Sequence, residues 1–274
     1  MNKVRLLEEV LRRGLAPEER IARSLIMQGR VLVEGRPVTG EGVAIPADAA
    51  IELCEEKQPY VSRGGLKLSN FLQAIGEGAN FIKGSVCLDV GASTGGFTEA
   101  LLEWGAGRVY AVDVGVGLLD GKLRKDERVT PLEGVNAREL SREEVPEECS
   151  VFTVDVSFIS GVRVLRFIQP LLTPCPQGVL LLKPQFERRP DSEHERKGWF
   201  RDGIVVAPEL HSEVLLEAYR RLSEGNWEVV QVRRAEPSGA RGNAEFFLLL
   251  GQGRGGLSER AYTERVNQLL NLPG

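Results

Sequence analysis

Ionisable residues stand where apolar segments of the chain begin or end. Asp155 and Lys183 each close an apolar segment, and Glu245 opens the last one. A buried charge is costly without a partner, so charges at strand ends that face a common cleft indicate use. A fourth, Lys67, lies on a helix predicted over 66–75. The topology of a parallel sheet would bring all four to one edge, where amines and carboxylates can move a proton.

A glycine-rich turn lies between a predicted strand and a predicted helix. Gly91, Gly95 and Gly96 fit neither the dinucleotide pattern nor the phosphate loop, because the spacing differs and no lysine follows. Glycines let the backbone approach a ligand closely. Asp113 closes the next strand, where a carboxylate can accept hydrogen bonds from a ribose diol. This segment predicts a site for a cofactor that contains a nucleoside.

The turn and the acid after it are similar to motif I of the class I S-adenosylmethionine (SAM) methyltransferases. The resemblance implies SAM as the methyl donor; the alternative is an ordinary strand–turn–helix of another doubly wound domain. The cofactor-binding residues that it implies are Asp89, Gly91, Ala92, Ser93, Thr94, Gly95, Gly96, Phe97, Asp113, Val114, Asn136 and Asp155.

Strands alternate with helices after residue 60, which predicts an α/β domain. The connection 234–244 is too short for a crossover helix, so the last two strands should be antiparallel. We expect a Rossmann-like, seven-stranded, mostly parallel sheet with one antiparallel edge strand. The predicted strands are 86–90, 108–113, 128–132, 151–156, 178–183, 227–233 and 245–250; the helices are 66–75, 95–104, 159–172 and 208–223, with helical spacing again in 257–272.

The first 54 residues follow another pattern. Helices are predicted from Val4 to Arg13 and from Pro17 to Gly29, then short strands at 31–33 and 50–53. The spacing in Arg5–Leu15 and Arg23–Gly35 resembles the small α+β RNA-binding domain named after ribosomal protein S-four, although Leu7 stands where that family commonly has Asp.

This second resemblance implies that arginines contact RNA phosphates, which position a protein without reading sequence. The alternative is that helical arginines pair with nearby glutamates such as Glu9 and Glu19. The candidate RNA-binding residues are Arg5, Arg12, Arg13, Arg20, Arg23, Arg30, Arg63, Arg188 and Arg189. The polar segment 187–201 is either a binding loop, with Trp199 or Phe200 stacking on a base, or a surface loop.

Lys67, Asp155, Lys183 and Glu245 match, in order and spacing, the Lys-Asp-Lys-Glu tetrad of FtsJ-like RNA ribose 2′-O-methyltransferases. The whole chain to about residue 250 resembles the haemolysin-A or TlyA family, in which an S-four-type domain precedes that enzyme. The segments that carry this resemblance are Ser62–Leu68, Leu88–Phe97, Asp155–Ser160 and Lys183–Glu187. The implied division is an RNA-binding domain (1–54), a linker (55–63), a methyltransferase domain (64–252) and a helical tail (253–274).

The resemblance implies methylation of ribosomal RNA in ribosomal subunits, with cytidine as the target. A ribose hydroxyl is a poor nucleophile until a base takes its proton. We expect Lys183 to be this base, with its pKa lowered by burial, by Lys67 and by the positive charge of the methyl donor. Asp155 and Glu245 would orient the two lysines.

Composition limits the alternatives. The net charge of −4 gives no general basic footprint, so RNA binding must rest on local clusters. No apolar run approaches the roughly 20 residues of a membrane helix, and the N-terminus does not resemble a secretory signal. Four scattered cysteines predict neither a metal site nor disulfides, and we expect a cytoplasmic protein. A non-catalytic RNA- or ribosome-binding factor and a haemolysin-like membrane-active protein remain as alternatives; the oligomeric state stays open.

Overall fold

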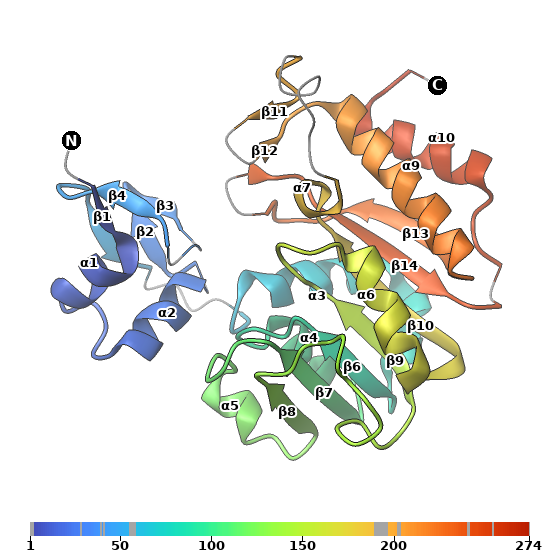
Figure 1. Cartoon of the computed structure of the whole chain (residues 1–274), viewed down its shortest axis with the longest axis horizontal. Helices are drawn as coiled ribbons and strands as arrows, with labels where there is room; N and C mark the ends of the chain where they lie inside the picture. The colour runs from blue at the N-terminus through green and yellow to red at the C-terminus, as the bar shows by residue number, and fades with distance from the viewer. Residues whose placement is uncertain are drawn as a thin grey trace.

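The computed structural model describes residues 3–27, 29–38, 40, 42–54, 59–188, 197–201, 204–239, 242–253 and 255–273 (Figure 1). Its first 54 residues contain two short helices and two small antiparallel sheets. The elements are β1 (Lys3–Arg5), α1 (Leu6–Arg12), α2 (Glu19–Met27), β2 (Val31–Val33), β3 (Arg36–Pro37), β4 (Ala44–Pro46) and β5 (Ile51–Leu53). The strand order is β1-β4 in one sheet and β3-β2-β5 in the other.

The first helix begins two residues later than the sequence predicts. Val4 and Arg5 pair with Ile45 and Ala44 in the β1–β4 ladder, so they are extended and not helical. A three-residue strand has no periodicity of its own, and its partner lies about 40 residues away. Both helices then bury apolar side chains in a common core with the strands. Its fully buried members are Leu6, Val10, Ala22, Ile26 and Val31.

A seven-stranded sheet in the order β13-β14-β10-β9-β6-β7-β8 forms the rest of the chain (Figure 1). The predicted α/β class and mostly parallel sheet are confirmed. The antiparallel strand is β14, which lies between β10 and the edge strand β13. The strands are β6 (Val86–Val90), β7 (Arg108–Asp113), β8 (Val129–Glu133), β9 (Cys149–Val154), β10 (Leu172–Leu182), β13 (Glu228–Arg234) and β14 (Phe246–Gly251). A short hairpin, β11 (Phe200–Arg201) and β12 (Ile204–Val205), precedes β13.

Helices cover both faces of this sheet, as alternating burial along the strands requires. The larger helices are α3 (Arg63–Ile75), α4 (Gly96–Glu103), α6 (Gly161–Ile168), α9 (Pro208–Glu224) and α10 (Glu259–Leu270). The first two share one apolar cluster with the sheet, and the other three share a second cluster with it. Shorter pieces are α5 (Gly121–Arg124), α7 (Pro184–Glu187) and the 3₁₀ segments Gly76–Ile82 and Gln169–Leu171.

The helix predicted over 159–172 is shorter than expected. The Ser160 side chain accepts a hydrogen bond from the Arg163 amide and fixes the start of α6. Pro170 lacks an amide hydrogen, so the chain turns through a 3₁₀ segment and enters β10 at Leu172. The strand predicted over 178–183 therefore begins six residues early.

The C-terminal tail forms a helix that packs on the sheet domain. Ser258 caps α10 by accepting a hydrogen bond from the Ala261 amide. Tyr262 is fully buried and stacks on Tyr219 of α9 with ring centroids 4.7 Å apart. Within the described residues, no helix is both long and apolar enough to cross a membrane. The domain boundaries remain predictions, and residues 55–58 of the expected linker lie outside the described part.

Candidate functional site

Strand register brings three of the four predicted catalytic residues to one end of the sheet. Leu182 pairs with Phe246 in the antiparallel β10–β14 ladder, so Lys183 and Glu245 lie one residue beyond the same pair. Asp155 follows β9, the parallel neighbour of β10 on the other side. The three side chains therefore leave adjacent strands at a single edge.

Lys67 reaches the same edge from α3. Its Nζ lies 2.6 Å from Glu245 Oε2, and Lys183 Nζ lies 2.6 Å from Asp155 Oδ1. The exposed fractions of the Lys67 and Glu245 side chains are 8% and 6%, against 12% and 21% for Lys183 and Asp155. The two ion pairs thus form one cluster, and the Lys183–Asp155 pair is its more open side.

The direction of the Lys183 pKa differs from the sequence-based expectation. Burial lowers it, but the negative charges of Asp155 and Glu245 and the hydrogen bond with Asp155 together raise the pKa of Lys183 above its usual value. The sequence analysis counted burial and the second lysine, whereas the structure pairs that second lysine with Glu245. Lys183 is therefore protonated at neutral pH in this arrangement.

Sequence reasoning did not assign a role to Ser157. Lys183 Nζ donates a hydrogen bond to Ser157 Oγ at 3.1 Å, so the amine is held from two sides. The only sequence signal was the position of Ser157 two residues after Asp155. We define Lys67, Asp155, Lys183 and Glu245 as the tetrad, and Ser157 as its hydroxyl neighbour.

Glu187 was also missed, although it closes a sequence motif. Its carboxylate accepts hydrogen bonds from Ser160 Oγ at 2.5 Å and from the Gly161 amide at 2.7 Å, at the N-terminus of α6. Desolvation raises the pKa of Glu187 although these hydrogen bonds oppose it. Glu187 therefore ties the segment after Lys183 to the segment after Asp155, which fixes the two catalytic segments against each other.

A loop from β13 to β14 is fastened to α3 before it reaches Glu245. Arg63 Nη2 donates to the Ser238 carbonyl at 2.6 Å, and Asn70 Nδ2 donates to the Glu236 carbonyl at 3.1 Å. A Cβ on Gly239 would lie 2.1 Å from Glu245 Oε1, so only glycine leaves room for that carboxylate. Arg63, predicted to contact RNA, is engaged in this internal contact.

The glycine-rich turn lies directly beside the tetrad. Gly91 has φ +87°, and a Cβ there would lie 2.3 Å from the Asp155 carbonyl oxygen. The turn ends at Gly95, with φ +97°, which is the N-cap of α4. A larger residue at either position would collide or strain the backbone. Glycine thus permits a narrow cradle between the β6 turn and the β9 end.

Asp113 is positioned by the loops that surround it. Its Oδ2 accepts a hydrogen bond from the Ser93 amide at 2.8 Å, and its Oδ1 accepts one from the Gly115 amide at 2.7 Å. Val114, next to it, is 70% exposed and offers an apolar surface. Asn136 Oδ1 accepts a hydrogen bond from the Arg138 amide and is partly exposed. Of the other predicted cofactor residues, Ser93 is partly exposed and Ala92, Thr94, Gly96 and Phe97 are buried.

Asp89 does not face the cradle. It is fully buried, and its two carboxylate oxygens accept hydrogen bonds from Thr98 at 2.6 Å and Thr153 at 2.8 Å. Burial raises the pKa of Asp89 to about 6. The sequence grouped it with the cofactor residues because it precedes the turn; the structure places it beneath the turn, where it joins β6 to α4 and β9.

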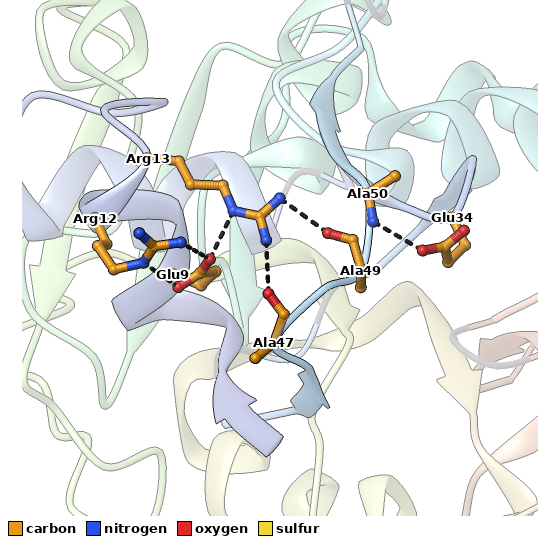
Figure 2. Close-up of polar contacts among 7 residues, drawn as sticks. All are labelled: Glu9, Arg12, Arg13, Glu34, Ala47, Ala49 and Ala50. Carbon is orange, nitrogen blue, oxygen red and sulfur yellow. Dashed lines mark hydrogen bonds and ion pairs between the residues drawn. The ribbon is translucent and has the colours of Figure 1, made fainter. Parts of the chain in front are cut away.

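Two of the predicted RNA-binding arginines surround a buried carboxylate in the first unit (Figure 2). Glu9 accepts hydrogen bonds from Arg12 and from Arg13, the latter at 2.6 Å. Arg13 also donates to the carbonyls of Ala49 at 2.9 Å and Ala47 at 3.2 Å. These contacts tie α1 to the segment before β5, so the structure favours the ion-pair alternative for Arg13. Arg12 keeps a side chain that is 68% exposed.

The other candidate arginines are distributed unevenly. Arg23 pairs with Glu19 at 2.7 Å on the surface of α2, again as the alternative predicted. Arg5 is exposed on β1, and Arg30 is partly exposed before β2. Nothing is said of the Arg20 side chain, which lies outside the described part.

The segment 187–201 is described only in part, and Arg189 lies outside the described residues. Arg188 pairs with Glu213 of α9 at 2.8 Å. Trp199 and Phe200 pack against the larger apolar cluster of the sheet, and Lys197 lies 4.5 Å above the Trp199 ring. Both rings therefore have partners within the protein in this structure, in contrast to the predicted base-stacking role.

Known proteins resemble this chain over most of its length. Residues 60–252 match the model of the FtsJ-like methyltransferase family. The 16S/23S rRNA (cytidine-2′-O)-methyltransferase TlyA of Mycobacterium tuberculosis is 39% identical over 254 residues, which are 90% of each chain. Hemolysin A of Brachyspira hyodysenteriae is 36% identical over 89% of this chain and 98% of that protein. A solved structure from Streptococcus thermophilus, described as a candidate hemolysin, has a TM-score of 0.71 and 32% identity, and the match covers 99% of this chain and 97% of that one.

Proposed function

The chain belongs to the FtsJ-like methyltransferase family, a family of enzymes whose methyl donor is S-adenosylmethionine, and we propose that it methylates the ribose 2′-hydroxyl of cytidine in ribosomal RNA. The observation that carries the proposal is the joined pair of ion pairs, Lys67–Glu245 and Lys183–Asp155, at the strand ends beside a glycine cradle. The names of the similar proteins support ribosomal RNA as the substrate and cytidine as the target.

The cradle residues fit the donor. Gly91 and Gly95 would let the methionine half approach the backbone, because no Cβ occupies that space. Asp113 would hold the ribose diol, and exposed Val114 would cover the adenine. Bound S-adenosylmethionine supplies an electrophilic methyl group carried on a positively charged sulfur.

The tetrad would handle the proton of the acceptor. Lys183, in its neutral form, takes the proton of the ribose hydroxyl while the oxygen forms its bond to the methyl carbon and the carbon–sulfur bond breaks towards sulfur. Ser157 and Asp155 orient the Lys183 amine, and Lys67, held by Glu245, keeps a positive charge near the acceptor oxygen. Holding the acceptor in line can contribute roughly 7–11 kcal/mol at best.

The raised pKa of Lys183 has a consequence for the pH dependence. Since the amine must lose its proton before it can act as a base, the neutral fraction increases with pH throughout the accessible range. We expect kcat/KM to rise with pH from neutral into the alkaline range. A rate that is flat over this range would argue against Lys183 as the base.

The proposal is tested with methyl-labelled S-adenosylmethionine and separated ribosomal subunits. Label is expected on RNA, at the ribose of a cytidine, and mapping by alkaline hydrolysis should show one protected linkage at each target. Label on a base, or no label with either intact subunit, would contradict the proposal. The non-catalytic alternative predicts RNA binding without label.

A further inference from the structure

A groove of 580 Å³ opens beside the tetrad, and nothing in the mechanism above uses it. It lies between the loop that follows Asp155 and the helices α6, α7 and α9. Four arginines, two glutamates, three phenylalanines and three smaller residues line it: Arg138, Phe158, Ile159, Ser160, Arg163, Val164, Phe167, Phe186, Glu187, Arg188, Glu217 and Arg221. The groove is thus locally basic in a chain whose net charge is −4.

The acidic residues of the groove are already engaged. Glu187 is bound to the N-terminus of α6, and Glu217 pairs with Arg221 at 2.5 Å. Arg188 is also neutralised, because it pairs with Glu213 of α9 at 2.8 Å. The charges that remain to attract a ligand are therefore arginine charges.

Arg138 and Arg163 supply those charges. Both side chains are exposed, and within the described part of the chain neither forms an ion pair. Arg138 lies 5.9 Å from the centre of the Phe167 ring, which sets its guanidinium beside an apolar wall. Guanidinium groups bind phosphate with two parallel hydrogen bonds, and aromatic rings accept the faces of bases. This pairing suits a single-stranded nucleic acid.

The groove and the tetrad share two short pieces of chain. Three residues separate Phe158 from Asp155, a span of about 11 Å at most. Four residues separate Glu187 from Lys183, and the Glu187–Ser160 hydrogen bond holds these two pieces together. A strand with a ribose at the tetrad therefore has the groove as its immediate neighbour.

We propose that this groove binds the phosphates of the RNA segment next to the methylated ribose, through Arg138 and Arg163. The inference rests on the proposed function, because it takes RNA as the substrate. It assigns the positioning of the strand to the methyltransferase domain itself, in addition to any contact made by the first 54 residues. The groove thus contributes affinity and not chemistry.

The test compares three variants of the full chain: Arg138→Ala/Arg163→Ala, and the controls Arg260→Ala and Arg220→Ala/Arg260→Ala. Arg220 and Arg260 are exposed and pair with Glu259 and Glu264 away from the groove, so the second control removes the same charge. Affinity for deproteinised ribosomal RNA and for intact subunits is measured at several salt concentrations. Affinity for S-adenosylmethionine and the thermal midpoint are measured in parallel.

The groove variant should bind both forms of RNA at least tenfold more weakly than the matched control. Each lost phosphate contact should reduce the slope of log affinity against log salt by about 0.7. The affinity for S-adenosylmethionine and kcat at saturating RNA should stay within twofold of wild type. Equal affinity and slope in the groove variant and its matched control would overturn the proposal.

Other outcomes separate the groove from the enzyme. If only binding to intact subunits weakens, the groove contacts a ribosomal protein and the proposal is wrong. If the wild-type chain binds no RNA, the proposal is also wrong. If RNA binding depends on the groove but no ribose is methylated, the proposed function fails while the groove stands.

Discussion

Two clusters of carboxylates and cations use the same kinds of contact to different ends. In the first unit, Glu9 is held by Arg12 and Arg13 along one helix and its neighbouring segment. At the strand ends of the sheet, Asp155 and Glu245 are each held by a lysine. Both clusters contain short ion pairs and largely buried carboxylates. The difference lies in the cation, because an arginine does not release its proton in proteins whereas a lysine can.

The comparison teaches that a buried ion pair is not by itself evidence of chemistry. The Glu9 cluster joins elements close in sequence and lies on a helix, so its role is to brace a small fold. The tetrad joins residues as distant as 67 and 245 at the edge where parallel strands end, beside a glycine cradle. Residue type and position together distinguish a brace from a catalyst.

The largest expected effect separates charge from proton transfer. Lys183→Arg keeps a cation beside Asp155 but removes the transferable proton site, so methyl transfer should fall about 10²–10⁴-fold, as in Lys183→Ala. Single-turnover rates with labelled S-adenosylmethionine and ribosomal subunits measure this. Lys122→Arg, at an exposed ion pair with Glu99, is the matched control and should retain the wild-type rate. Near-wild-type activity in Lys183→Arg would assign Lys183 an electrostatic role only.

The next effect concerns stability. Lys67→Met leaves Glu245 buried without its partner, which should destabilise the methyltransferase domain by about 3–5 kcal/mol. Adding Glu245→Leu should recover most of this loss, because no unpaired charge remains. All three tryptophans, Trp104, Trp199 and Trp227, lie in this domain, so their fluorescence follows its unfolding in urea.

The matched control for that prediction is an exposed ion pair. Arg23→Ala breaks the pair with Glu19 on α2 and should change the free energy of unfolding by about 0–1 kcal/mol, here followed by circular dichroism. A loss in Lys67→Met no larger than that in Arg23→Ala would mean that Glu245 is solvated or protonated when alone.

The sequence was sufficient for the strands and for the order of the tetrad. Apolar runs that end on Asp155 or Lys183 carry a signal within a few residues, and parallel topology then places their ends together. The partners of each charge were not predictable, since they depend on the register of β10 against β14 and on how α3 meets the loop before Glu245. The raised pKa of Lys183 follows from those partners.

Glu187 shows the same limit for a positioning residue. Its partner Ser160 lies 27 residues away, and no local pattern links them. The arginines of the first unit show the reverse case, because their glutamate partners lie three or four residues away and helical spacing alone predicts the pairs. Sequence therefore predicted the local brace better than the contacts that organise the catalytic site.

A smaller effect is expected from that link. Glu187→Gln preserves the size of the side chain but turns an amide donor towards a site that receives donors, which costs about 1–3 kcal/mol. The two segments that carry Asp155 and Lys183 then lose their common anchor, and kcat should fall about tenfold while KM for RNA changes little. Glu213→Gln, at the exposed pair with Arg188, is the control and should leave kcat unchanged. A fall in the thermal midpoint with kcat intact would show that Glu187 only stabilises the fold.

The smallest effect concerns the brace. Hydrogen bonds from Arg12 and Arg13 lower the pKa of Glu9 to about 2, from an ordinary value of 4.5. Because the folded pKa is the lower one, the brace contributes its full stability above pH 4.5 and loses it as the pH falls through 2. Hydrogen exchange of the α1 and α2 amides should therefore accelerate across this interval, and more steeply in wild type than in Glu9→Gln, which has no carboxylate to titrate. Methyl transfer measured after return to neutral pH should be unaffected, since the tetrad does not depend on this cluster. Parallel acceleration in both proteins would show that other carboxylates, and not the Glu9 brace, govern the acid stability of the first unit.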